Sequence, residues 1–185
     1  DAPPVPALEM ALRARFGVRV TRAALPPGLL RRYDQAQRVV ALERNLPEPT
    51  RAFQIATQLA ELALAAQIDA ALAGAELEST AAHAVARVGL ANYAAGAILM
   101  PYREFLSAAK QLGHDIEQLQ RRYGTSFEQV CHRLSTLQRP GARGVPFYFV
   151  RVDQAGNITK RHSSTRFQFA RFGGTCPLWN VHEAF

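Results

Sequence analysis

An apolar stripe between Ala52 and Ala66 constrains the fold of this chain more than any other feature. Apolar side chains recur there every three or four residues, at Ala52, Ile55, Ala56, Leu59, Leu62, Ala63 and Ala66. This period is that of an α-helix with one buried face. We therefore predict a long core helix that begins near Pro49 and runs to about Ala73, before Gly74.

The bulk composition is that of a globular protein. The chain has 185 residues, 48% of them hydrophobic, with a mean hydropathy of −0.11. Its apolar stretches are broken by polar residues, so we expect no membrane span. The first residues lack the basic and apolar regions of a signal peptide. Two cysteines, Cys131 and Cys176, cannot build a disulfide framework, which favours a reducing, cytoplasmic location.

The charge balance favours an anionic partner. The formal net charge is +7, and only Lys110 and Lys160 are lysines, so 20 of the 22 basic residues are arginines. Arginine is suited to bidentate contacts with phosphate and carboxylate groups. A GC-rich genome, which favours arginine and alanine codons, explains the same bias without any partner. The choice between a nucleic acid and a phosphorylated small molecule stays open at this point.

The pattern of elements predicts an α+β protein in two parts. A helical part, residues 1–138, precedes a small antiparallel β part, residues 139–185, with the loop RPGARG at the boundary. We also expect the second part to continue beyond residue 185. The predicted helices cover residues 7–16, 49–73, 80–100, 102–111, 115–123 and 127–138, and the predicted strands cover 18–21, 37–42, 145–152, 158–161 and 167–172.

The core helix contains the segment FQIATQLAE, which stands where a zinc hydrolase would carry His-Glu-x-x-His. Together with LANYAAGAILMPYREF, it resembles the ImmA/IrrE metallopeptidase-like family. The resemblance implies a zincin-like helical domain. Thr57, Gln58 and Glu61 occupy the positions of the motif, and Val88 occupies the position of the third, acidic ligand. Because all the metal ligands and the base are changed, we expect no metal, no catalytic residues and no enzyme.

The second half is similar to the short-chain fatty-acyl transcriptional regulators, through SFEQVCHRL, RPGARGVPF and CPLWNVHEAF. The resemblance implies a sensor domain that binds coenzyme A or a short acyl-CoA and regulates propionate or acetate metabolism. It also implies a separate helix-turn-helix domain that binds DNA. Some relatives carry an iron–sulfur cluster on cysteines. Two cysteines cannot hold one in the usual way, so we expect no cofactor here and keep Cys176 as a weak cluster candidate.

Coenzyme A requires arginine forks or backbone N–H groups for its phosphates and an apolar cavity for its acyl end. Arg139 and Arg143 lie in a glycine-containing loop that an ordinary connector would also explain. Tyr93 and Tyr102 flank the former metal cleft, where a cavity is expected, although a plain core position for both is slightly favoured over a role in binding. Phe147 and Phe149 are predicted to share one strand face. The predicted ligand-binding residues are Tyr93, Tyr102, Arg139, Arg143, Phe147, Tyr148, Lys160 and Arg161.

Three other functions compete with a sensor domain. A dimerisation module, with a homodimer as the assembly, and a module that contacts nucleic acid are both compatible with the composition. A metallohydrolase is disfavoured by Thr57, Gln58, Glu61 and Val88. For the sensor we expect linkage, in which the ligand prefers one arrangement of the two parts and the loop 139–144 acts as a hinge or contact.

Overall fold

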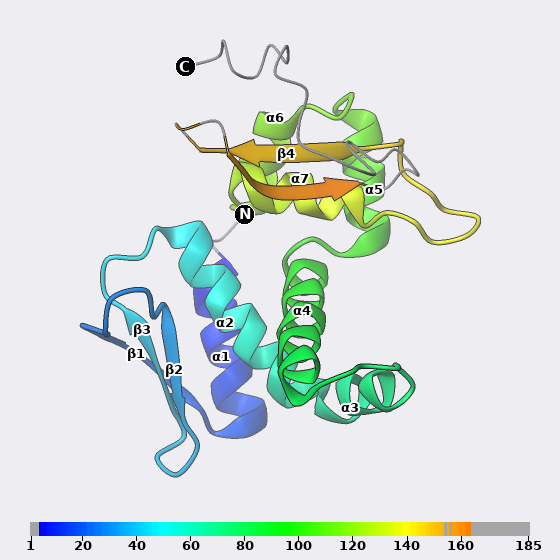
Figure 1. The fold of residues 1–185 in the computed structure, drawn as a ribbon. Coiled ribbons are helices and arrows are strands. Elements are labelled where there is room, and N and C mark those ends of the chain that lie inside the picture. Colours follow the sequence, from blue (N-terminus) through cyan, green and yellow to red (C-terminus); the bar gives the residue numbers. More distant parts are fainter. Residues whose placement is uncertain (1–3, 154, 156, 164–185) are drawn as a thin grey trace. The chain divides into compact units, whose positions relative to one another are not determined.

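The chain folds into two compact units, residues 1–126 and residues 127–185 (Figure 1). The structure is a computed structural model that describes residues 4–153, 155 and 157–163. The predicted strand 167–172 and Cys176 lie outside these residues. Helices and two small sheets make up the described part, so the α+β class is confirmed.

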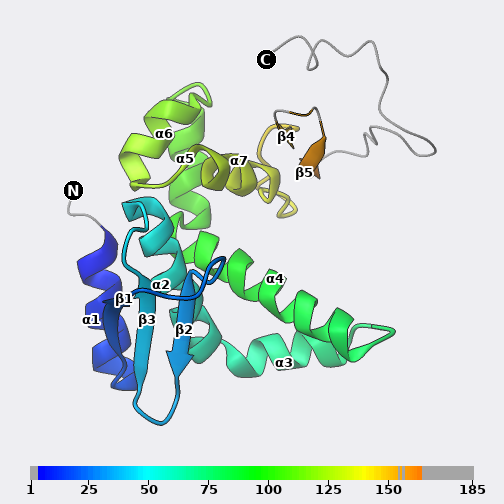
Figure 2. The same cartoon turned by 60° about the vertical axis from the view of Figure 1, so that its left-hand side comes forward.

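The first unit begins with a helix and a three-stranded sheet. Helix α1 (Pro4–Phe16) precedes β1 (Arg19–Ala23), β2 (Arg31–Asp34) and β3 (Val39–Glu43). In the sheet order β1-β3-β2, β3 lies parallel to β1 and antiparallel to β2. Figure 2 shows the strands side by side next to α1 and α2 (Glu48–Ala63). Strand β2 was not predicted, because its sequence RRYD has no apolar alternation.

The core of this unit forms where α2 packs against α1, β3 and α4 (Thr80–Leu99). Alanines four residues apart are fully buried on both long helices, with Ala52, Ala56 and Ala60 on α2 and Ala91 and Ala95 on α4. Side chains this small allow two helix backbones to approach closely along their i±4 ridges. The apolar stripe of the sequence is therefore a helix-packing face.

The predicted long helix is in fact two helices that meet at Leu64. Helix α2 ends at Ala63, and α3 (Ala65–Ala73) continues after a bend of 73°. The bend lets Ile68 and Leu72 form a second apolar cluster with Ala91 of α4. In the described part no single helix has the length and apolarity to cross a membrane, and only the bent pair α2–α3 passes, by length and composition alone.

The remaining helices of the first unit begin and end where the sequence predicts. Ser79 caps α4, since its hydroxyl accepts a hydrogen bond from the Ala82 N–H at 3.1 Å. Pro101 then separates α4 from α5 (Tyr102–Gln111). Asp115 caps α6 (Ile116–Tyr123), which ends at Gly124 in the left-handed conformation.

The second unit combines α7 (Phe127–Ser135) with an antiparallel hairpin of β4 (Tyr148–Val152) and β5 (Ile158–Ser163). Helix α7 and strand β4 are both shorter than predicted. Because β4 begins only at Tyr148, Phe147 precedes the strand, and the prediction that Phe147 and Phe149 share a strand face was wrong. The division between 138 and 139 stays a prediction.

Candidate ligand-binding site in a peptidase-like domain without metal ligands

The positions of the metal motif lie on α2 and are packed, not open. The side chains of Thr57 and Gln58 are only 3% and 2% exposed. The Thr57 hydroxyl donates to the Phe53 carbonyl oxygen at 2.8 Å and lies 3.5 Å from Asn92 Oδ1 of α4. Val88 of α4, by contrast, is 54% exposed. Thr57, Gln58, Glu61 and Val88 line neither of the two pockets described below.

A guanidinium group from the sheet contacts two of the motif positions. Arg31 of β2 donates from Nη1 to Gln58 Oε1 at 2.7 Å and to Glu61 Oε2 at 3.0 Å. Its Nη2 donates to Glu61 Oε1 at 2.9 Å, which completes a bidentate ion pair. The two side chains are 17% and 30% exposed, so water screens this pair less than a surface pair. A protein cation thus binds the side chains at two motif positions.

The sequence did not reveal the role of Arg31, because the residue lies on the strand that was not predicted. One signal for this contact was available in the sequence. Glu61 is a carboxylate next to the apolar stripe of the core helix, and a carboxylate in such a place needs a cation as its partner. In the described part no group of three or more His, Cys, Asp or Glu side chains could hold a metal ion. At these positions the structure shows a carboxylate and an amide bound by a guanidinium group.

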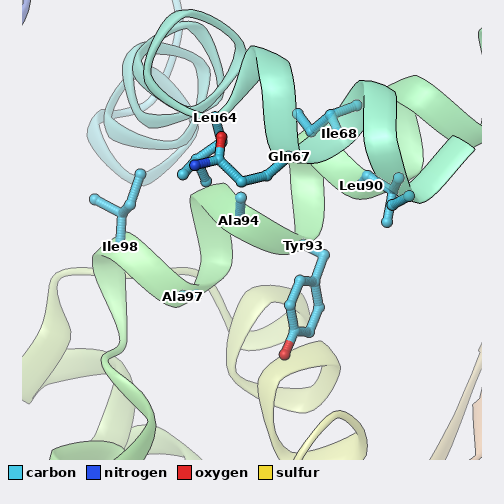
Figure 3. Close-up of a pocket in the computed structure, with 9 residues that line it drawn as sticks. Leu64, Gln67, Ile68, Leu90, Tyr93, Ala94, Ala97 and Ile98 are labelled. Carbon is cyan, nitrogen blue, oxygen red and sulfur yellow. The ribbon is translucent and has the colours of Figure 1, made fainter.

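An apolar pocket of about 370 Å³ lies between α3 and α4, one turn beyond the motif positions (Figure 3). Its lining residues are apolar except for Gln67 and Tyr93. Leu64, Gln67 and Ile68 face α4, whereas the ring of Tyr93 points away from α3 and borders the pocket. The lining residues are Leu64, Gln67, Ile68, Ala71, Leu90, Tyr93, Ala94, Ala97 and Ile98. A pocket of this size and composition suits the apolar end of a small ligand.

Among the predicted ligand-binding residues of the first unit, only Tyr93 lines this pocket. Tyr93 is 51% exposed. Tyr102 is half-buried at the start of α5 and is not one of the lining residues. Tyr93 therefore borders an apolar pocket, but at a different place on the helix pair from the former metal cleft, and its role in ligand binding stays a prediction.

The predicted phosphate loop lies in the second unit, after α7. Arg139 and Arg143 are both exposed. The Ala142 N–H donates to the Arg139 carbonyl at 3.0 Å, and Gly141 has a φ of 77°, so the loop is a tight turn. Arg133 of α7 is only 3% exposed and its Nη1 lies 3.4 Å from Thr136 Oγ1. The analysis of the sequence missed this buried arginine.

Lys160 and its neighbours form a polar cluster on the hairpin. Lys160 Nζ and Arg151 Nη1 donate to the two oxygens of Glu128 at 2.5 and 3.0 Å. Burial raises the pKa of the Glu128 carboxyl, but the bond and charge of Lys160, with Arg151, outweigh it and hold the pKa below its usual value. Lys160 is thus already paired. Tyr148 is 49% exposed and Phe147 half-buried, and Arg161 pairs with Val150 in the strand ladder.

Two imidazoles meet beside this cluster. The rings of His132 and His162 lie 3.7 Å apart between centroids, and both contact Phe149 at 5.3 Å. Burial, with the charges of His162 and Lys160, lowers the pKa of His132 to about 4. Burial and Lys160 also lower the pKa of His162. Burial raises the pKa of the Cys131 thiol to about 11, so this buried thiol is inert.

The helix pair α2–α4 and the sheet define the class of the first unit. It is a metallopeptidase-like domain in which Thr57, Gln58 and Glu61 replace the ligands and the base, and in which an arginine contacts Gln58 and Glu61.

Comparison with known proteins gives the family. Residues 13–135 match the model of the IrrE N-terminal-like domain, and residues 136–185 match that of the short-chain fatty acyl coenzyme A regulator C-terminal domain. The chain therefore belongs to the short-chain fatty acyl coenzyme A regulator family, with an IrrE-like domain at its N-terminal side. Both resemblances found in the sequence are confirmed.

Curated relatives include the HTH-type transcriptional regulator PrpR of Mycobacterium tuberculosis, which is 55% identical over 94% of this chain and 36% of its own length. The propionyl-CoA carboxylase regulator of Cereibacter sphaeroides is 52% identical over 97% of this chain and 38% of its own length. A solved structure of a Mycobacterium tuberculosis transcriptional regulator superposes with a TM-score of 0.91 and 52% identity, over 99% of this chain and 56% of that one. The chain spans little more than a third of the length of these curated relatives.

Proposed function

We propose that this chain is the ligand-binding region of a transcriptional regulator of short-chain fatty acid metabolism, and that it binds coenzyme A or a short acyl-CoA such as propionyl- or acetyl-CoA. The observation that carries the proposal is the apolar pocket between α3 and α4. It adjoins a motif in which Thr57, Gln58 and Glu61 stand in place of the histidines and the glutamate of a zinc hydrolase, so we favour binding without turnover. The family of the C-terminal segment supports the nature of the ligand.

The pocket provides what an acyl-pantetheine chain needs. Ala94, Ala97 and Ile98 give the apolar wall for a short acyl group, and the Gln67 amide offers a partner for an amide of the pantetheine arm. A volume of about 370 Å³ exceeds that of a propionyl group, so part of the arm would enter as well. For the phosphates we propose the exposed guanidinium groups of Arg139 and Arg143.

Regulation would follow from linkage. If the ligand prefers one arrangement of a longer regulator over another, that difference in affinity shifts the population of the two. In this proposal a separate helix-turn-helix region contacts DNA, as the names of the curated relatives suggest. No DNA contact by this chain is required.

The test is calorimetric titration of the chain with coenzyme A and with acetyl-, propionyl- and butyryl-CoA. Ala97→Phe, which fills the pocket from α4, is expected to weaken acyl-CoA binding about tenfold, as the loss of a buried apolar contact would. The matched control Ala84→Phe changes an exposed alanine of the same helix and leaves affinity unchanged. Equal affinities of Ala97→Phe and the original chain would remove the pocket from the proposal. Absence of binding by all four compounds would end the proposal.

A further inference from the structure

The positive charge of the chain is concentrated in one segment of the first unit. Residues 13–44 contain eight arginines but only two carboxylates, Asp34 and Glu43, so they carry +6 of the net +7. The arginines are Arg13, Arg15, Arg19, Arg22, Arg31, Arg32, Arg38 and Arg44. The segment folds as the end of α1 and the sheet. A local excess of this kind attracts anions to the surface.

A second pocket, of about 510 Å³, opens within this segment, where the end of α1 meets the β2–β3 turn. Its polar lining consists of the guanidinium groups of Arg15 and Arg38, the phenol of Tyr33 and the amide of Gln35, with Phe16 and Leu62 as apolar walls. No carboxylate lines it. Of the ion pairs among the described residues, none involves Arg15 or Arg38. The pocket is therefore a concave surface whose positive charge is not neutralised.

Local backbone geometry directs both guanidinium groups to this place. Arg38 ends the β2–β3 turn with a φ of 51°, a left-handed conformation that few non-glycine residues adopt. Its Nη1 lies 3.4 Å from the Phe16 carbonyl oxygen, and Arg15 lies over the Phe16 ring, 5.6 Å from its centroid. A Cβ atom at Gly17 would come within 3.2 Å of Arg38 Nη1. Glycine thus leaves the room that Arg38 occupies.

Arg38 also has a purely structural explanation. A cation at the C-terminal end of α1 interacts favourably with the last carbonyl groups of the helix. That role uses one N–H of the five in the guanidinium group. It does not account for Arg15, Tyr33 and Gln35, which supply further donors to the same pocket.

We infer that this pocket binds the phosphoryl group of a small anion, either free or carried by a nucleotide. Two guanidinium groups and two neutral donors match the several acceptor oxygens of a phosphoryl group. The apolar ring of Phe16 gives a flat wall beside them. The site shares no lining residue with the apolar pocket, and it stands whether or not acyl-CoA is the ligand there.

The test is titration of the whole chain with sodium pyrophosphate and, separately, with ADP, at low ionic strength in chloride buffer. Saturable binding is expected, and the variant Arg15→Gln/Arg38→Gln should weaken it at least tenfold. The control Arg13→Gln/Arg103→Gln removes the same charge from exposed positions outside the pocket and should stay within twofold. Arg15→Gln alone, which leaves Arg38 in contact with α1, should still weaken binding. ADP affinity above that of pyrophosphate would assign a nucleotide, and equal affinities a free anion.

Three results would overturn the inference. The first is the absence of saturable binding of either anion. The second is an equal loss in the control variant, which would reduce the effect to net charge. The third is tight binding of duplex DNA that is weakened by Arg15→Gln/Arg38→Gln but is not displaced by pyrophosphate. This result would make the surface a nucleic-acid contact.

Discussion

At the scale of single residues, the ion pair of Arg31 with Glu61 connects the sheet to the core helix. Each partner is largely removed from water, and Gln58 adds a third hydrogen bond. When one partner of such a pair is removed, the other stays desolvated without its counter-charge. The pair should therefore matter more to stability than the exposed ion pairs of this chain.

Glu61→Ala is expected to lower the free energy of unfolding by about 2 kcal/mol, because the Arg31 guanidinium loses both oxygens of its partner. In a double-mutant cycle with Arg31→Leu, we expect a coupling energy of about 1–3 kcal/mol from urea denaturation. The comparison pair is Glu117 and Arg121 of α6, whose side chains are 73% and 74% exposed. Its coupling should stay below about 0.5 kcal/mol. Similar couplings in the two cycles would contradict the role given to Arg31.

This residue also shows the limit of what the sequence predicts about the site. The motif positions Thr57, Gln58 and Glu61 were located correctly on the core helix, since a 3.6-residue period fixes their faces. What contacts them was not predicted. Arg31 is 30 residues away from Glu61 along the chain, and its strand is too short and too polar to give a periodic signal.

At the scale of elements, two glycines of ordinary backbone conformation illustrate opposite constraints. A Cβ atom at Gly144 would lie 2.8 Å from Leu137 Cβ, whereas one at Gly89, within α4, would meet nothing within 4 Å. Gly144→Ala should destabilise the protein by about 1–3 kcal/mol through this overlap. Gly89→Ala should stabilise it by about 0.5–1 kcal/mol through lower chain entropy of the unfolded state. Thermal denaturation of both variants gives the measurement, and a destabilising Gly89→Ala would contradict this account of α4.

The imidazole pair between α7 and β5 makes the stability of this packing depend on pH. The pKa of His132 is near 4 in the folded chain and near 6.5 when unfolded, so the unfolded chain binds more protons between these values. Stability is then fully present above about pH 6.5 and falls as the pH drops toward 4. Glu128 opposes this shift and Lys160 reinforces it.

We therefore expect hydrogen exchange of the α7 and β4–β5 backbone to be faster at pH 5 than at pH 7.5, after correction for the intrinsic pH dependence of exchange. His132→Gln should flatten this dependence, while His83→Gln, on α4, should leave it as it is. If exchange in the original chain is independent of pH between these values, the imidazoles do not titrate as stated.

Elements were predicted well where a cap or a breaker marks their ends, as at Ser79, Pro101 and Gly124. The break at Leu64 was missed because neither glycine nor proline marks it. Tertiary packing determines the position of this break, because a single straight helix would not place Ile68 and Leu72 against Ala91. Strand β4 was predicted to begin too early, because Val145 and Phe147 are apolar residues but apolar character alone does not require hydrogen bonding to a neighbouring strand.

At the scale of the whole molecule, the net charge of +7 opposes the compact state through self-repulsion. We expect the midpoint of thermal unfolding to rise by a few degrees when sodium chloride increases from about 20 to 300 mM, because the Debye length falls below 10 Å. The variant Arg13→Gln/Arg22→Gln removes two exposed arginines from the positively charged residues 13–44. This variant should show a smaller rise of the midpoint. A midpoint that falls with salt would mean that attractive surface pairs outweigh the repulsion.

The contact of Arg31 with Gln58 and Glu61 has a consequence for how this lineage can change. A histidine at position 61 would break the ion pair and leave the Arg31 guanidinium group beside the incoming ligand, where it repels a divalent ion. Restoring a histidine at position 61 would therefore require a change of Arg31 on β2 as well, because either substitution alone leaves a charged partner without its counter-ion. Selection that acts on one substitution at a time thus tends to keep the ion pair in place.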